Sequence, residues 1–417
     1  MIDVPGPWGT GPFTLSEGSS SITTRTVVIS PEPFAATNLI ESEQRTPTLV
    51  LTANRDHWNR AARGPRIDKA VFRNDLDPVT ALDLCLAGDG EVDIVTEVDP
   101  SDAARVESSS FADLVTSDAN RVLVGIINRG QTDVPLDDVD VRKALNHAVD
   151  RARVLAEGLH GYGTVIPALT PPWCSGYDAS LSPYEHDPAR ARQLLADKWP
   201  AGRPLRVACP ESFQGIGQLL ADSLREGLGL EVELTVVGTA DLPPAQRVLV
   251  EKALTPPWDV LVHAWFDLSS EAPPAVVHRE FFGRDGAFRA GPHDEGFDAL
   301  FDEMKVQIDG DRLVEVATRI DRYCHEQALA LYLCAPQALY AVNKHVSFGP
   351  YRTTFEIAEV TVDEGHWSRN GGGGATPGDT VALDGAEGVA GYGGPGAPEP
   401  GPSGKRPGFS GAAGNAC

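Results

Sequence analysis

Signatures of the common nucleophilic, phosphate-binding and zinc-dependent enzymes are missing from this 417-residue sequence. It has no GxSxG, no GxxxxGK[ST] and no HExxH, which argues against serine hydrolases, phosphate-loop enzymes and zinc proteases. Uninterrupted apolar segments are missing as well, since no window approaches the ~18 apolar residues of a membrane-spanning helix. The first residues carry no basic, apolar or lipoprotein-type export signal. We therefore expect a protein that is not an enzyme and has no membrane span.

Cysteines and basic residues are also scarce. The six cysteines form no CxxC pair and match no zinc spacing, so we expect no metal site and no cofactor. Pairing of Cys324 with Cys334 stays open. The chain has 35 basic against 59 acidic residues, a formal net charge of −24. Such an excess of acids disfavours binding to nucleic acid or to an anionic membrane surface.

Strand-like and helix-like segments alternate through most of the chain. Apolar runs typical of strands occupy 48–51, 69–72, 122–127, 205–208, 230–237 and 260–265, with a shorter β-like run at 24–29. Helical periodicity or capping signals mark 78–88, 139–157, 188–198, 213–228, 295–307 and 311–329. This alternation predicts an α/β fold with a largely buried sheet.

The end of the chain has a different composition. Residues 371–417 hold 16 glycines and 6 prolines, so 22 of 47 positions disfavour regular structure. Such a segment buries too little apolar surface to offset the entropy that is lost on ordering. We expect the folded part to end near Trp367 and residues 369–417 to form a disordered tail.

The segment from Trp258 to Asp267 is the most informative candidate for a binding site. It resembles a buried strand that ends in two aromatic residues and a carboxylate. Ligands of α/β sheets bind beyond the carboxyl ends of strands. Asp267 is suited to pair with a ligand ammonium, and Trp265 to stack on a ligand. The alternative, core aromatics followed by a helix-capping aspartate, stays open.

Two clusters resemble metal sites at first sight. Four aspartates lie between positions 133 and 140, but the Gly and the final Glu of a calcium loop are missing. Asp137 or Asp138 more simply starts the following helix. His263, His278 and His293 are fifteen residues apart and share no helix face. We expect neither cluster to hold a metal.

Five blocks of the chain, in this order, resemble family 5 of the bacterial extracellular solute-binding proteins, the ABC-importer receptors for peptides, nickel and related ligands. The blocks are Gly9–Leu15, Asn54–Arg73, Leu86–Ile94, Val139–Arg151 and Tyr184–Leu195. The last two, VDVRKALNHAVDR and YEHDPARARQLL, are the most specific. They are close to the family's v-R-x-A-l-n-x-A-i-D-R and y-x-y-D-P-x-x-A-x-x-L-L patterns. The resemblance spans about residues 9–367.

The resemblance implies a two-lobe, type II periplasmic-binding-protein fold, in which two hinge crossings let the lobes close on a ligand. Carried onto this chain, it assigns 1–128 to part of the first lobe, 129–338 to the second lobe and 339–368 to a return to the first lobe. The hinges are then expected at Asn128 and Asn343. The first lobe is expected to be incomplete, because family members carry well over a hundred residues before the first block.

The same resemblance implies a function. It is that of the solute-binding component of an ABC importer, with a peptide or similar small amine-bearing solute in the interlobe cleft. A monomer that works with ABC permease subunits is expected. The candidate ligand contacts are Trp265, Asp267, His278 and Arg279, and Asp267 is the nearest match to the aspartate that holds the ligand's α-amino group in peptide-binding members. The expected location is outside the cytoplasm if the true start lies upstream, and cytoplasmic if Met1 is the real start.

Two alternatives remain beside this interpretation. One is an intracellular enzyme on the same scaffold, with Asp267, His278 and Glu280 in its pocket, where a general acid–base pair would lie within hydrogen-bond reach of substrate. The other is a non-functional fragment of a longer receptor, produced by a mis-started or shifted reading frame. A metal chelate is the second choice of ligand.

Overall fold

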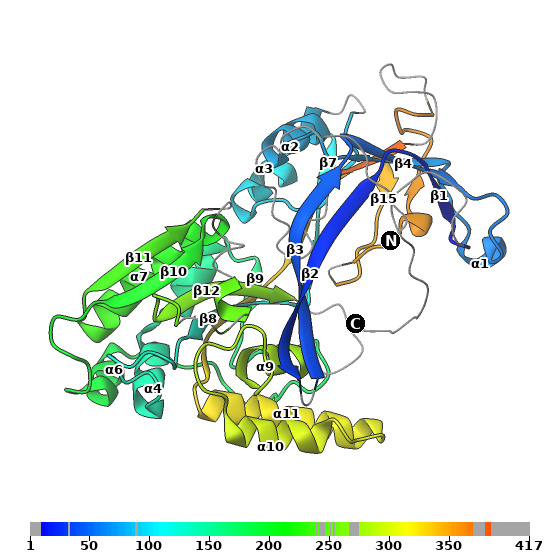
Figure 1. The fold of residues 1–417 in the computed structure, drawn as a ribbon. Helices are drawn as coiled ribbons and strands as arrows, with labels where there is room; N and C mark the ends of the chain where they lie inside the picture. The colour runs from blue at the N-terminus through cyan, green and yellow to red at the C-terminus, as the bar shows by residue number, and fades with distance from the viewer. Residues whose placement is uncertain are drawn as a thin grey trace, which may run out of the picture.

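The structure is a computed structural model and describes residues 10–31, 34–87, 91–238, 241, 247–250, 252, 255–266, 275–352, 354–369 and 380–384. Two separate sheets organise these residues, and Figure 1 shows them at the upper right and the lower left. The first sheet has seven strands in the order β1 (Phe13–Glu17), β4 (Thr48–Ala53), β5 (Lys69–Arg73), β17 (Thr380–Asp384), β6 (Ile94–Val95), β14 (Ala338–Asn343) and β7 (Ala112–Ser117). The second has six strands in the order β11 (Val232–Val237), β10 (Leu205–Pro210), β12 (Val260–Phe266), β8 (Arg121–Ile127), β13 (Ala330–Pro336) and β9 (Gly163–Val165). We call each sheet with its helices the seven-stranded lobe and the six-stranded lobe.

The six-stranded sheet is buried on both faces. The helices on one face are α4 (Val139–Ala148), α6 (Pro188–Leu195) and α7 (Gln214–Leu228), with α5 (Arg151–Arg153) close by. Those on the other face are α9 (Ala275–Phe282), α10 (Glu295–Met304) and α11 (Gly310–Glu326). Alternate residues of β8 enter the two cores, Leu123 on one side and Val124 on the other. Burial on both faces explains why these strands are continuous apolar runs in the sequence.

The seven-stranded sheet packs α2 (Pro78–Ala87) and α3 (Ala103–Glu107) on one face, while α1 (Arg60–Arg63) lies beyond β4. Its other face is covered by the segment that contains β15 (Val346–Ser347) and β16 (Thr361–Val362). Strand β17 lies between β5 and β6 and runs parallel to both. The structure here differs from the expected disordered tail, because the apolar run TVALD pairs as a strand. The remaining residues of that tail after 369 lie outside the described residues.

The described chain passes between the two sheets twice. The first crossing is at 118–120, between β7 and β8, and the second is at Gln337, between β13 and β14. The expected hinge Asn128 instead follows the last residue of β8, and the expected hinge Asn343 is the last residue of β14. Each expected hinge therefore lies about one strand after a crossing, whereas the expected end of the second lobe at residue 338 is next to the second crossing. The first crossing was misplaced because β8 was assigned to the first lobe but pairs with β12 and β13 in the six-stranded sheet.

A long two-stranded hairpin stands apart from both sheets. Strands β2 (Ser20–Pro31) and β3 (Phe34–Arg45) pair antiparallel with each other alone, and they leave the seven-stranded lobe between β1 and β4. Figure 1 shows the hairpin running down to the side of α9 and α10 in the six-stranded lobe. No helix in the part of the chain described by the structure has the length and apolar character needed to cross a membrane.

Candidate functional site

The carboxyl end of β12 lies at the crossing between the lobes. Strand β12 runs antiparallel to β8, so that Phe266 lies opposite Arg121, the first residue after the crossing at 118–120. Strand β10 is parallel to β12, and its carboxyl end points the same way. Arg121 also contacts the seven-stranded lobe, since its Nη2 is 3.5 Å from Oε1 of Glu97. The topology thus directs the candidate ligand segment toward the other lobe.

Of the four expected ligand contacts, the structure describes the side chains of His278 and Arg279. Trp265 belongs to β12, but its side chain, like the whole of Asp267, lies outside the described residues. His278 is 2% exposed, and its Nε2 is 3.3 Å from Oδ1 of Asp321 in α11. Arg279 donates a hydrogen bond to Asp285, at 3.1 Å. His278 and Arg279 therefore have partners within their own lobe, and a ligand contact of either residue stays a prediction.

The side chains of the two suspected metal clusters form hydrogen bonds, ion pairs or ring contacts with other residues of the chain. His278 faces Asp321, whereas His293 pairs with Asp298 at 2.6 Å. The aspartates between 133 and 140 each contact a basic side chain: Arg203 binds Asp133, Arg129 binds Asp137, and Lys198 binds Asp138 and Asp140. Asp138 also caps α4, as the sequence suggested. No group of three or more possible metal ligands occurs among the described residues.

His263 on β12 lies inside an aromatic cluster. Its ring centroid is 5.3 Å from that of Phe288 and 6.0 Å from that of Phe281. Burial lowers the pKa of His263 to about 4, because the charged imidazolium loses its hydration there. The ring is therefore neutral at physiological pH and acts as an aromatic packing residue.

This lowered pKa predicts a pH dependence of stability. Between about pH 6.5 and 4 the unfolded chain takes up a proton at His263 that the folded chain does not, so the free energy of unfolding falls as the pH falls. Between pH 6.5 and pH 4 we expect the free energy of unfolding to fall by about 3 kcal/mol less in His263→Leu than in the wild type. Urea unfolding at pH 6.5 and at pH 4 measures this difference. His186→Leu, which removes an exposed histidine, is the control, and equal slopes in wild type and His263→Leu would contradict the prediction.

The crossing also carries a group that the sequence analysis missed. The Arg352 guanidinium lies over the rings of Trp173 and Tyr351, 5.9 Å from each centroid. It donates to the backbone oxygens of Asp118 and Trp173 at 3.4 Å, and no carboxylate of the described residues pairs with it. The Nε1 atom of Trp173 is buried without an acceptor among the described residues. Arg352 and Trp173 are 179 positions apart, so no local pattern reveals their contact.

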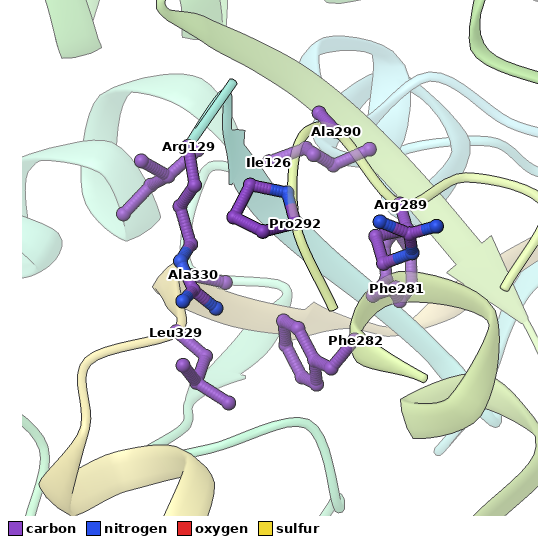
Figure 2. Close-up of a pocket in the computed structure, with 10 residues that line it drawn as sticks. Ile126, Arg129, Phe281, Phe282, Arg289, Ala290, Pro292, Leu329 and Ala330 are labelled. Atoms are coloured by element: carbon purple, nitrogen blue, oxygen red, sulfur yellow. The ribbon is translucent and has the colours of Figure 1, made fainter. Parts of the chain in front are cut away.

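A small pocket lies at the opposite end of β8 from the crossing. Figure 2 shows it between Ile126 and Leu329 of the six-stranded sheet region and Phe282 of α9. The lining is mostly apolar, and its Arg129 pairs with Asp294 at 3.3 Å. The pocket is therefore internal to the six-stranded lobe and separate from the crossing.

The family block at Val139–Arg151 fixes α4 to the strand that leads back to the second crossing. Arg142 donates to the backbone oxygen of Gln327, Asn146 to that of Ala330, and Arg151 to that of Tyr332. Burial lowers the pKa of Arg151 to about 10. The most specific block of the sequence therefore supports the lobe rather than a ligand.

Comparison with known proteins decides the family. Residues 5–280 match the family model described as bacterial extracellular solute-binding proteins, family 5, middle region. The chain belongs to this family. The sequence-based resemblance is thus confirmed.

Two curated relatives of this family-5 protein are peptide-binding proteins by name. The probable di/tripeptide-binding protein 5 of Pseudomonas aeruginosa is 24% identical over 315 residues, which cover 73% of this chain and 56% of that protein. The dipeptide-binding protein of Escherichia coli is 29% identical over 158 residues, 38% of this chain and 28% of that protein. The chain therefore matches about half or less of the length of these relatives.

The solved structures agree on the fold. The substrate-binding protein CtaP of Listeria monocytogenes, an ABC transporter component, superposes with a TM-score of 0.67 at 18% identity. The alignment covers 85% of this chain and 67% of that protein. The family-5 chain thus has the expected type II periplasmic-binding-protein fold.

Proposed function

We propose that this protein binds a short peptide or a similar small amine-bearing solute between its two lobes, as the receptor of an ABC importer. The observation that carries the proposal is the family match over residues 5–280. The crossing adds support, because strand ends, two aromatic rings and a guanidinium without a carboxylate partner among the described residues meet there. The receptor acts outside the cytoplasm, passes its ligand to permease subunits and carries out no chemical step.

Two residues have opposite roles in this proposal. Asp267 follows β12 and holds the ligand's ammonium group, with Trp265 beside it. Arg352 binds a ligand carboxylate, because only two of the five N–H groups of its stacked guanidinium donate to backbone oxygens of the described residues, each at 3.4 Å. The preferred solute is then a short peptide with both termini free.

Thermal unfolding with four forms of one dipeptide tests this function. We use Ala-Ala, its amide, its N-acetyl derivative and the doubly blocked molecule. A ligand at 100 times its Kd stabilises the native state by about 2.7 kcal/mol, which raises Tm by several degrees. We expect a rise with free Ala-Ala, smaller rises with the singly blocked forms and none with the doubly blocked form.

Two variants assign the two ends of the ligand. Arg352→Ala is expected to weaken binding of the free acid about 10- to 100-fold, with little effect on the amide, since a hydrogen bond to a charged group contributes about 1.5–3 kcal/mol. Asp267→Ala is expected to lose the preference for a free amine. The controls are Arg190→Ala and Asp311→Ala, which remove exposed charges elsewhere. No rise with any peptide, or hydrolysis of Ala-Ala detected by mass spectrometry, would contradict the proposed function.

A further inference from the structure

The β2–β3 hairpin connects the two lobes at a point far from both crossings. At its base the backbone N–H of Thr46 donates to the oxygen of Ser19, and this pair lies beside β1 and β4 of the seven-stranded lobe. Val27 is eight residues after Ser19, which at about 3.3 Å per residue is roughly 26 Å from the base. There Val27 packs with Val250 and Ala287 of the six-stranded lobe.

Val27 is buried in this contact with the six-stranded lobe. It is 9% exposed, whereas its neighbour Val28 is 54% exposed on the other side of the strand. Among the hairpin side chains that the structure describes, Val27 is the one that is buried. A two-stranded hairpin is only marginally stable by itself in water, so its conformation depends on such a contact.

The surface beneath Val27 is held firmly by its own lobe. The backbone N–H of Ala287 donates to Oε2 of Glu280 at 2.9 Å, and the Ala287 oxygen accepts from Nζ of Lys252 at 2.8 Å. The next residue, Phe288, also packs against this cluster, and its ring meets His263 of β12. The hairpin thus docks on a preformed surface that leads directly to the candidate ligand strand.

We propose that the β2–β3 hairpin is a strap between the lobes, which must release Val27 before the lobes can separate. The two crossings allow a hinge motion, and the strap adds a third connection that resists it. Burial of one valine side chain favours the docked over the released strap by about 10- to 100-fold. The docked strap therefore keeps the lobes close together without a ligand.

Distances between spin labels test the strap in the protein without ligand. One label replaces Val79 on α2 and the other Ile308 after α10, both highly exposed, in a chain with Cys174 and Cys417 changed to serine. We expect one narrow distribution of label-to-label distances in the doubly labelled protein that keeps Val27. In the doubly labelled Val27→Asp variant we expect an additional population at longer distances. The matched control is Val28→Asp on the same strand, which should keep the parent distribution. Identical distributions in Val27→Asp and Val28→Asp would overturn the proposal.

A disulfide variant keeps the test decisive if Val27→Asp does not fold. We expect oxidised Val27→Cys/Ala287→Cys to form a cross-link that intact mass spectrometry detects, whereas Val28→Cys/Ala287→Cys does not. Reduction should increase hydrogen exchange in the segments around Val250 and Ala287 relative to the cross-linked form. Absence of a cross-link in Val27→Cys/Ala287→Cys, or exchange that is unchanged by reduction, would overturn the proposal. Neither readout uses a ligand, so failure of the strap leaves the proposed function standing.

Discussion

Replacing Asp259 with alanine is expected to lower the free energy of unfolding by about 3–5 kcal/mol, the usual effect of removing one partner of a buried ion pair. Asp259 is fully buried just before β12. Arg203 binds it through two N–H groups, with Nη1 2.5 Å from Oδ2 and Nη2 2.8 Å from Oδ1. The backbone N–H of Arg206 donates to the same carboxylate at 2.8 Å. The substitution therefore leaves a guanidinium that is only 9% exposed without its inner partner.

The ion pair also connects three segments of the six-stranded lobe, which explains the size of the expected loss. Arg203 reaches outward to Asp133, and the indole N–H of Trp199 donates to the Arg203 backbone oxygen at 2.7 Å. Urea unfolding followed by tryptophan fluorescence measures the loss. The control is Asp222→Ala, which breaks an exposed pair with Arg225 on α7 and should change stability by less than about 0.5 kcal/mol. Equal losses in the two variants would contradict the buried-pair explanation.

The second large effect is expected from Asp93→Ala in the seven-stranded lobe. Asp93 is 1% exposed, and its Oδ1 accepts from Asn343 Nδ2 at 3.2 Å, His366 Nε2 at 3.0 Å and Trp367 Nε1 at 2.9 Å. The backbone N–H of Ser368 donates to Nδ1 of His366, so Nε2 carries the proton that faces Asp93. A buried donor left unpaired costs about 1–3 kcal/mol, and we expect a total loss of about 3–5 kcal/mol.

The effect of Asp93→Ala should be local. Hydrogen exchange is expected to rise at β6, at the end of β14 and at 366–368, while the six-stranded lobe stays protected. Asp93→Asn keeps one acceptor oxygen and should lose less stability. The control is Asp363→Ala in the same segment, whose partner His345 is half exposed, and we expect it to change stability much less than Asp93→Ala does. Uniform exchange across both lobes would show that Asp93 does not act on one lobe alone.

Individual helices and strands could be predicted because their signals are local. The Asp187-Pro188 pair marks the start of α6, where the Asp187 side chain accepts from the backbone N–H of Arg190. The run 122–127 is β8 and the run 260–265 lies in β12. Apolar runs and capping residues report on the nearest few positions, and this is sufficient for an element.

The assignment of strands to sheets could not be predicted in the same way. A buried apolar strand has the same composition in either sheet, so nothing in 122–127 shows that β8 lies beyond the first crossing. The length of the hairpin could not be predicted either. The sequence indicated a short β-like run at 24–29, whereas the structure has two paired strands of 12 residues each. The contact of Val27 with Ala287 joins positions 260 apart, and only the fold brings them together.

The strand that carries the candidate site could be predicted from the sequence, whereas the contacts of the residues after it could not. The sequence indicated the carboxyl end of the strand at 260–265, and the topology places that end at the crossing. His278 and Arg279 were among the expected ligand contacts. In the structure the His278 ring turns inward to Asp321, a partner 43 positions away. The stacking of Arg352 on Trp173 likewise joins two segments that are distant in the sequence and that only the fold brings together.

The position of β17 sets an order of events during synthesis of the chain. All strands of the six-stranded sheet lie within residues 121–336, so this sheet can form while later residues are still being added. The seven-stranded sheet cannot, because β5 and β6 pair with β17 rather than with each other, and β17 is the last described strand to leave the ribosome. Until then β5 and β6 each present an unpaired edge, which is a template for association between nascent chains. Slow completion of this sheet would make the protein dependent on chaperones that shield such edges.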